Sequence, residues 1–226
     1  MVTDPNELMR HKPFIATLLT LLSVTLFSVT SQATETIRFA PEDILGWEKE
    51  KFEGETRYEL TEVDGESALH AICDNSASGL YLEQSIDLEK TPVIEWRWRI
   101  RETFGPDIDE TRKSGDDYPV RLYAVKDGGW RRWRTQAVNY VWASGKEIGS
   151  EWPNAYTSRA RMVAVQSGEE KAGEWVTQRR NLADDFEQLH GERPKKLDAI
   201  AIMSDCDDLE TRMEAWYGEI RLLPAD

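Results

Sequence analysis

The stretch that decides the fold runs from Pro92 to Val125 and reads PVIEWRWRIRETFGPDIDETRKSGDDYPVRLYAV. Both of its ends alternate apolar and polar side chains with a period of two, which is typical of strands buried on one face. We therefore expect two strands joined by a long acidic loop. The predicted inward faces are Trp96, Trp98 and Ile100 in the first strand and Val120, Leu122 and Ala124 in the second.

The opposite face of these two strands is polar. Arg97 and Arg99 alternate with the tryptophans of the first strand, and Arg121 and Tyr123 alternate with the apolar residues of the second. Since successive side chains of a strand point to opposite faces, these polar residues share one side. If the two strands are neighbours, an arginine and tyrosine face lies over an aromatic core.

The rest of the chain contains about ten short strand-like segments separated by turn signals. Asp64-Gly65, between two alternating segments, predicts a β-hairpin. One helix is expected from Asn181, a favourable N-cap, to Gly191, which suits a left-handed C-cap. Many strands with one short helix predict an all-β fold, a two-layer antiparallel β-sandwich.

The N-terminal segment has the pattern of a secretory signal peptide. Basic residues near Arg10 precede an apolar run from Phe14 to Val29, and Ser31-Gln32-Ala33 is a small-x-small cleavage site. We expect residues 1–33 to be removed and residues 34–226 to form a single domain in the periplasm or outside the cell. The alternative is that the apolar run is kept as a membrane anchor.

The chain is acidic, with a formal net charge of −14. The expected signal segment carries two acidic and two basic residues, so this charge belongs to the domain that follows. Nucleic acids and anionic lipid surfaces bind to basic patches, and we expect neither as a partner. No apolar run after residue 33 is long enough to span a bilayer, so we expect no stable membrane insertion once the signal is cleaved.

Two cysteines remain to be explained, Cys73 and Cys206. In an oxidising compartment they can form a disulfide, but either can equally be a small buried apolar residue. Aspartates at 116–117 and at 205, 207 and 208 form oxygen-rich loops that would suit calcium, although solvated turn carboxylates explain them more simply. We expect no cofactor, with calcium as the alternative.

The polar strand face is the candidate ligand site, provided that the strand registers match. The last strand, expected over 214–223, is predicted to turn Trp216 inward and to add Tyr217 and Glu219 to the polar side. Arginines and carboxylates beside aromatic rings suit a sugar, and the alternative is a solvated, salt-bridged sheet face. The candidate ligand-binding residues are Arg97, Arg99, Arg121, Tyr123, Asn139, Trp142, Asp205, Tyr217 and Glu219.

Four motifs in order resemble an exported bacterial family known as domain-of-unknown-function family 3047. The resemblance extends from about Trp47 to the C-terminus and implies a jelly-roll sandwich similar to galactose-binding-like domains and carbohydrate-binding modules. It implies no established activity. Cys206 departs from the small polar residue usual in the family at this place, which weakens any metal role for the loop. The motifs are Lys113–Arg121, Asn139–Trp142, Ala199–Asp205 and Tyr217–Ile220.

These observations favour a non-catalytic protein that binds a glycan or another small polar ligand. One alternative is an enzyme. Tyr123 or Tyr140 as a base, with Arg97, Arg121 and Asn139 around a uronate carboxylate, would make a polysaccharide lyase, and paired acidic residues would make a glycosidase. The other alternative is a structural or interaction module of the cell envelope. We expect Arg121→Ala to abolish binding with the fold retained, because some arginine donors would face the ligand.

Overall fold

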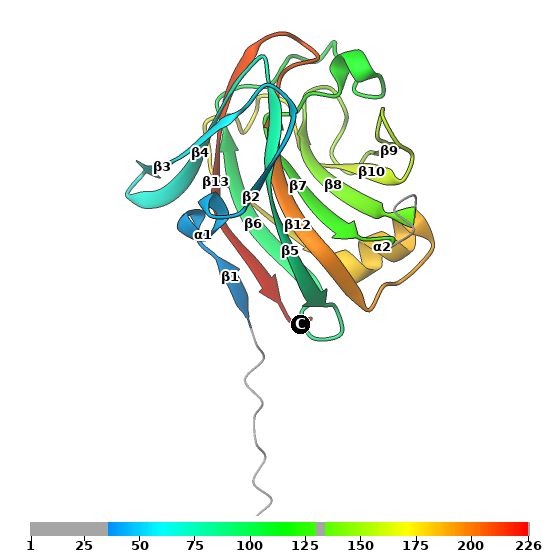
Figure 1. The fold of residues 1–226 in the computed structure, drawn as a ribbon. Helices are drawn as coiled ribbons and strands as arrows, with labels where there is room; N and C mark the ends of the chain where they lie inside the picture. Colours follow the sequence, from blue (N-terminus) through cyan, green and yellow to red (C-terminus); the bar gives the residue numbers. More distant parts are fainter. Residues whose placement is uncertain (1–35, 130–133, 226) are drawn as a thin grey trace, which may run out of the picture. The chain divides into compact units, whose positions relative to one another are not determined.

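Two β-sheets pack face to face around an aromatic core in the computed structural model, which describes residues 36–129 and 134–225. These residues belong to the compact unit Thr34–Asp226 (Figure 1). The predicted class, an all-β sandwich of jelly-roll type, is confirmed. None of the helices in the described part of the chain has the length and apolar character needed to cross a membrane.

Six strands of the described residues form the first sheet. Their order is β11-β6-β13-β4-β3, and β1 pairs with β13 beside this path. The predicted hairpin at Asp64-Gly65 is confirmed, since it joins β3 to β4. The strands are β1 (Ile37–Phe39), β3 (Arg57–Val63), β4 (Glu66–Asp74), β6 (Val93–Ile100), β11 (Val176–Asn181) and β13 (Arg212–Leu223).

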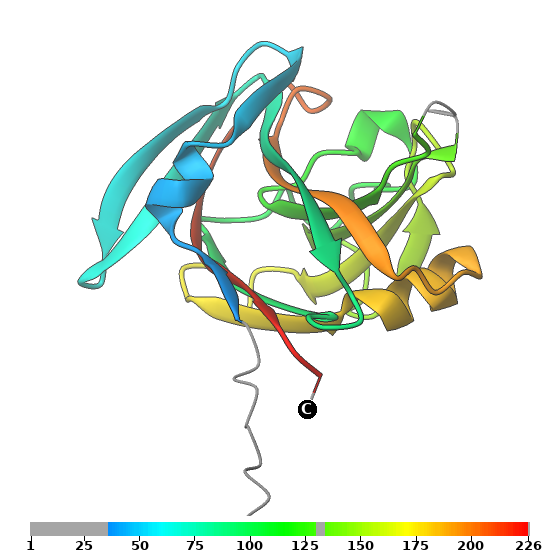
Figure 2. The same ribbon diagram turned by 60° about the horizontal axis from the view of Figure 1, so that its bottom comes forward.

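Seven further strands form the second sheet, in the order β2-β5-β12-β7-β8-β10-β9. Its pairs are antiparallel except for β8 and β10, which run parallel. The strands are β2 (Glu48–Glu53), β5 (Ala77–Asp87), β7 (Arg121–Lys126), β8 (Gln136–Ala143), β9 (Glu151–Pro153), β10 (Ala160–Ser167) and β12 (Lys196–Asp205). Figure 2 shows the two sheets as separate layers.

The predicted helix is present as α2 (Leu182–His190). The side chain of Asn181 accepts the backbone N–H groups of Ala183 and Asp184, and Gly191 ends the helix with a φ of 73°. Two shorter elements add to it, the helix α1 (Pro41–Leu45) and the 3-10 turn η1 (Lys113–Gly115). Local capping chemistry therefore gave the position of α2 correctly.

The core confirms the predicted inward faces. Trp96, Trp98 and Ile100 of β6 are buried, as are the apolar residues predicted to point inward from β7 and the position before it. The rings of Trp96 and Trp98 meet edge to face at 5.3 Å, and Trp96 lies 5.2 Å from Tyr140 of the other sheet. The core therefore lies between the two sheets.

The condition for one shared polar face, that these two strands are neighbours, is not met. β6 pairs with β11 and β13 in the first sheet, whereas β7 pairs with β12 and β8 in the second. The intervening loop crosses from one layer to the other. Because both strands turn their apolar residues inward, their polar faces lie on opposite outer surfaces of the sandwich.

The expected faces of β13 are also wrong at Tyr217. The register of β13 against β6 shifts between Tyr217 and Ile220, so the alternation changes phase there. As a result Tyr217 is buried together with Ile220, and Trp216 is only partly buried. Gly218 allows a close approach, because a Cβ there would lie 2.5 Å from Cγ of Arg97.

Cys73 and Cys206 are joined by a disulfide, with their Cα atoms 6.1 Å apart. Cys73 is in β4 of the first sheet, and Cys206 directly follows β12 of the second. The bond therefore ties the two layers together at the segment that follows β12. Both cysteines are fully buried and pack with Met213.

Candidate functional site

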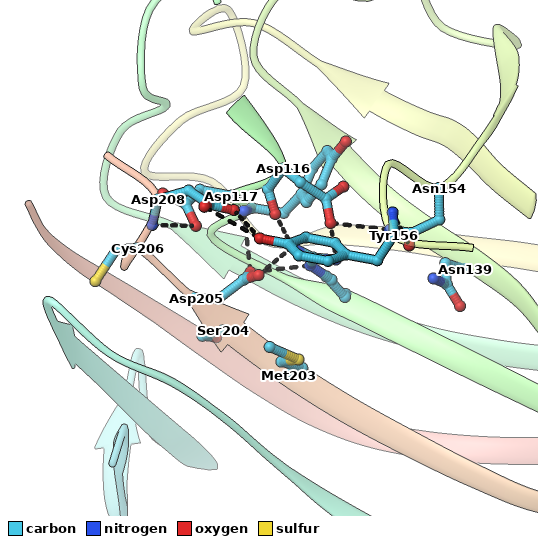
Figure 3. Close-up of polar contacts among 12 residues, drawn as sticks. Asp116, Asp117, Asn139, Asn154, Tyr156, Met203, Ser204, Asp205, Cys206 and Asp208 are labelled. Atoms are coloured by element: carbon cyan, nitrogen blue, oxygen red, sulfur yellow. Dashed lines mark hydrogen bonds and ion pairs between the residues drawn. The ribbon is translucent and has the colours of Figure 1, made fainter. Parts of the chain in front are cut away.

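A pocket of about 480 Å³ lies on the outer face of the second sheet, where β7, β8 and β12 run side by side. Five acidic side chains form much of its wall, and three aromatic rings contribute to it. The lining residues are Phe52, Glu53, Ala77, Asp116, Arg121, Tyr123, Asn139, Asn154, Tyr156, Thr157, Ala160, Met203, Asp205, Asp207 and Asp208. Figure 3 shows many of these side chains.

Arg121 holds the wall together. Its Nε donates to Oδ1 of Asp205 at 2.9 Å, and Nη2 donates to Oδ2 of Asp205 and to the backbone oxygen of Asp116. Nη1 faces Oδ2 of Asp116 and the hydroxyl of Tyr123, at 3.5 and 3.4 Å. These contacts account for all five N–H groups of the guanidinium. Arg121 therefore has no donor left for a ligand.

The surroundings of Arg121 fix its position further. The ring of Tyr118 lies 4.4 Å from the guanidinium carbon, and the hydroxyl of Tyr217 accepts the backbone N–H of Arg121 at 3.2 Å. Burial acts to lower the pKa of Arg121, but the charge of Asp205 and the groups around it hold it above the ordinary value. Burial raises the pKa of Asp205, and Arg121 opposes that shift. The pair is a buried ion pair within the pocket wall.

Two buried acceptors of the wall have no hydrogen-bond partner among the described residues. They are Oδ1 of Asp116 and Oδ1 of Asn139, whose residues are 3% and 1% exposed. The other oxygen of Asp116 accepts from the amide of Asn154 at 2.9 Å. Since unpaired buried polar atoms are rare, these two acceptors indicate that the pocket is suited to a hydrogen-bond donor.

Asp117, Asp205 and Asp207 bring three carboxylate oxygens within 4.8 Å of one another, the arrangement closest to a metal site. Both oxygens of Asp205 already accept from Arg121. The carboxylate of Asp117 accepts the backbone N–H of Leu209 at 2.7 Å and that of Asp208 at 3.4 Å. Calcium takes six to eight oxygens, so the cluster fits a hydrogen-bonded turn better than a calcium site.

Asp117, next to the acidic wall, has a raised pKa. Burial, followed by the nearby charge of Asp207, raises its pKa to about 6, although its backbone hydrogen bonds act in the opposite direction. Asp117 does not belong to the pocket lining. Its carboxylate accepts the backbone N–H groups of Asp208 and Leu209 and so fixes the backbone of that segment.

Two exposed aromatic side chains flank the acidic wall. Tyr156 is 57% exposed and Phe52 is 66% exposed, and both line the pocket. The hydroxyl of Tyr156 donates to the carboxylate of Asp208 at 2.9 Å (Figure 3). The ammonium of Lys113 lies 4.6 Å from the centre of the Tyr156 ring. The rim of the pocket is therefore aromatic and carries a cation of the chain itself.

The structure brings together four of the residues predicted as ligand-binding. Arg121, Tyr123, Asn139 and Asp205 line the same pocket. Tyr217 reaches it from the core, where its hydroxyl also donates to the backbone oxygen of Met203. These four residues therefore share one pocket, and their role in ligand binding stays a prediction; the guanidinium of Arg121 is occupied by contacts within the wall.

The other predicted residues lie elsewhere. Trp142 is fully buried, and its indole N–H donates to the backbone oxygen of Gly168. Arg97, Arg99 and Glu219 are on the outer face of the first sheet, because β6 and β13 belong to that sheet. The expectation of one shared arginine face is corrected in this respect.

Arg97 and Arg99 have local partners on that surface. Arg97 pairs with Glu66 and lies 4.5 Å from the ring of Trp175, while Arg99 pairs with Asp64 at 2.9 Å. Glu219 pairs with Arg38 and Arg221. A hollow of about 410 Å³ there includes Arg97 and Glu219 in its lining. The alternative of a salt-bridged sheet face describes this surface well.

Sequence reasoning missed Tyr156, Phe52 and Asn154 as pocket residues. The aromatic residues in the loops at 128–133 and 150–156 suggest, from the sequence, exposed platforms on which a ligand could stack. In the second loop, however, Trp152 is buried and donates to the backbone oxygen of Glu110. The other suggested platform, at 128–133, includes Trp130 and Trp133, which lie outside the described residues. The feature of the sequence that could have identified Tyr156 as a pocket residue is its place as an aromatic residue in an exposed loop, together with the acidic loops elsewhere in the chain.

The chain belongs to the family described as Protein of unknown function (DUF3047), which matches residues 45–221. The resemblance identified from the four motifs is thereby confirmed. A search of curated protein sequences finds no match to the chain.

A search of solved structures finds matches to the chain at low sequence identity. The glycoside hydrolase domain of Endo-D from Streptococcus pneumoniae R6 is 10% identical with a TM-score of 0.38; the match covers 78% of this chain but only 21% of that one. A cellulase derived from that of Rhodothermus marinus is 10% identical, with coverage of 82% and 99% and a TM-score of 0.43. A carbohydrate-binding module that recognises mannan is 14% identical, with coverage of 85% and 96% and a TM-score of 0.34.

Proposed function

We propose that this protein binds a carbohydrate or another small polar ligand, without catalysis, in the pocket between Tyr156 and the β7–β8–β12 surface. The observation that carries the proposal is the pair of buried, unpartnered acceptors, Oδ1 of Asp116 and Oδ1 of Asn139, in a pocket with exposed aromatic rings at its rim. Sugar hydroxyl groups donate hydrogen bonds to such acceptors, and the C–H face of a sugar ring packs on aromatic side chains.

A lyase mechanism has little support in this geometry. The hydroxyl of Tyr140 donates to Asp185 at 2.7 Å inside the core, away from the pocket lining. Burial raises the pKa of Tyr123, which disfavours its use as a base. Arg121 has no remaining donor for a uronate carboxylate. These three observations favour binding over uronate cleavage.

A glycosidase mechanism has some support, because the pKa values of Asp117, Asp205 and Asp208 are raised, which is typical of a general acid. Two of these residues line the pocket, but Asp205 is bound by Arg121 and Asp208 accepts the hydroxyl of Tyr156. Asp117 is buried, does not line the pocket and binds the backbone at 208–209. A general acid must reach the leaving-group oxygen of its substrate. Non-catalytic binding is therefore the function that the pocket supports best.

The proposal includes export, with cleavage after Ala33 and location in the periplasm or outside the cell. The signal-type sequence of residues 1–33 and the disulfide between Cys73 and Cys206 both support it. Intact-mass measurement of material from the periplasm or medium tests this directly. Full-length protein found only in the membrane fraction would contradict it.

A glycan array followed by calorimetry tests the binding function. We expect the wild-type protein to bind at least one glycan, and Tyr156→Ala to weaken that binding about tenfold through loss of stacking at the rim. Leu60→Ala is the matched control, because Leu60 is also exposed but lies on β3 of the first sheet. Absence of any glycan binding, or equal affinities for the two variants, would contradict the proposal.

A further inference from the structure

The pocket wall is strongly acidic and has no unused cationic donor. Five acidic residues line it, whereas Arg121 is the one basic residue among the described residues of the lining. The guanidinium of Arg121 is occupied by Asp205, Asp116 and Tyr123. An anionic ligand would therefore meet like charges in the wall, where Arg121 has no donor left to compensate them. The acidic lining residues are Glu53, Asp116, Asp205, Asp207 and Asp208.

The unpaired polar atoms of the wall are also of one kind. Oδ1 of Asp116 and Oδ1 of Asn139 are both acceptors, and both belong to side chains more than nine-tenths buried. A carboxylate oxygen accepts most strongly from a charged donor. The chemistry of these two atoms therefore calls for a ligand rich in N–H or O–H donors.

The rim gives a separate indication of charge preference. The ammonium of Lys113 lies 4.6 Å from the Tyr156 ring, and the hydroxyl of Tyr156 binds Asp208. A primary ammonium is thus already stabilised at this aromatic and acidic edge by a cation–π contact. An ammonium on a ligand that displaced Lys113 would find the same two features, an aromatic face and nearby carboxylates.

From the charge of the wall, the unpartnered acceptors and the position of Lys113, we infer that the pocket selects a sugar bearing a free, protonated amine, such as an oligosaccharide of glucosamine. This inference rests on the proposed function, since it names the ligand class of the same pocket. An N-acetylated sugar lacks the charge, and a uronate carries the opposite one. The pocket therefore ranks amino sugars first and uronates last.

Calorimetry with three oligosaccharides of equal length tests the ranking: a glucosamine oligomer, its N-acetylated counterpart and an oligogalacturonate, at a pH where the amines are protonated. We expect the glucosamine oligomer to bind at least about tenfold more tightly than the N-acetylated one, and no binding of the uronate. Equal or tighter binding of the N-acetylated oligomer would overturn the inference but leave the proposed function intact. Failure of all three oligomers, together with an empty glycan array, would overturn both.

Because the whole protein carries a charge of −14, attraction of a polycation at long range must be separated from binding in the pocket. Asp207→Asn removes one charge from the wall, and Glu170→Gln removes one from an exposed position between β10 and β11. We expect Asp207→Asn to weaken binding of the glucosamine oligomer about tenfold and Glu170→Gln to leave it within twofold. Equal effects of the two variants would show that only net charge acts, and the inference would be wrong.

Discussion

Arg121 is the residue on which the pocket depends, because it joins segments that are distant in the sequence. Its contacts connect β7 with the turn at Asp116 and with Asp205 at the end of β12. All three side chains are almost completely buried. Removing the cation would leave two carboxylates buried together without compensation.

We therefore expect Arg121→Ala to lower the free energy of unfolding by about 3–5 kcal/mol, because one partner of a buried ion pair is lost. Arg99→Ala is the matched control, since Arg99 pairs with the exposed Asp64. This variant should lose less than about 1 kcal/mol of the free energy of unfolding. Urea denaturation of both variants measures the difference. Similar losses for the two would show that the Arg121 network is not a stabilising ion pair. This expectation replaces the earlier one, in which Arg121→Ala left the fold intact.

Asp117 makes a pH-dependent contribution to stability. Its pKa is raised to about 6 in the folded protein, above the value of about 3.9 in an unfolded chain, so the folded state binds this proton more tightly. The stabilisation from this proton is fully present below about pH 4 and is lost as the pH rises through about 6. Asp117→Asn removes the titration.

The expected result is that the stability of wild type relative to Asp117→Asn falls as the pH is raised from about 4.5 to about 7.5. Thermal or urea midpoints of both proteins across this range provide the measurement. A constant difference between wild type and Asp117→Asn would mean that Asp117 has an ordinary pKa in the folded protein.

At the scale of single elements, two strands depend on a glycine at a point of close approach. In β5, a Cβ on Gly79 would lie 2.6 Å from the backbone oxygen of Ile202 in the neighbouring β12. In β13, a Cβ on Gly218 would lie 2.5 Å from Cγ of Arg97, which belongs to a side chain that can move. An added Cβ would therefore clash with a fixed backbone at Gly79 but with a movable side chain at Gly218.

Gly79→Ala should destabilise the protein by about 1–3 kcal/mol, because two paired backbones must separate. Gly218→Ala should cost less, about 1 kcal/mol, because Arg97 can turn away and give up its contacts with Glu66 and Trp175. Both substitutions reduce the conformational freedom of the unfolded chain equally. The difference between their losses of stability therefore measures the cost of the clash in the folded protein. A larger loss for Gly218→Ala would contradict the argument.

Alternation of residue types predicted most strand faces because a strand has a fixed period of two. It correctly predicted that Trp96, Trp98 and Leu122 point into the core. The same pattern failed at Tyr217. A register shift there reverses which residues of β13 point inward, and the sequence of apolar residues does not reveal this shift. Alternation also contains no information about which sheet a strand enters, so it left open whether β6 and β7 are neighbours, and they lie in different sheets.

At the scale of the whole molecule, the site could be predicted only in part from the sequence. Arg121, Tyr123, Asn139 and Asp205 come from three strands that are adjacent in one sheet, and their outward faces followed from alternation. The position of Tyr156 depends on a loop that folds back over that sheet, and long-range placement of loops leaves no periodic signal. The role of Arg121 depends on how many of its donors find partners, which requires the assembled fold.

The disulfide is the covalent link between the two sheets, and it closes a long stretch of chain, with Cys73 and Cys206 separated by 133 positions. A closed loop of this length restricts the unfolded chain by about 5 kcal/mol in the chain-entropy account. We expect the protein with Cys73→Ala and Cys206→Ala together to lose several kcal/mol in urea denaturation. Reduction of the wild-type protein under the same conditions should give a comparable loss. Unchanged midpoints in both cases would show that the bond adds no stability.

The pairing of β1 with β13 has a consequence for how the domain completes its folding. Ile37–Phe39 lies against Ile220–Leu222 in Figures 1 and 2, so the first strand of the domain finds its partner in the last one. A ribosome makes the chain from its N-terminus, and β1 must wait, without a partner strand, until β13 has been synthesised. Such long-range pairing slows folding. A chain whose first strand pairs only with its last one stays unfolded for longer, and this property would suit the export that we propose.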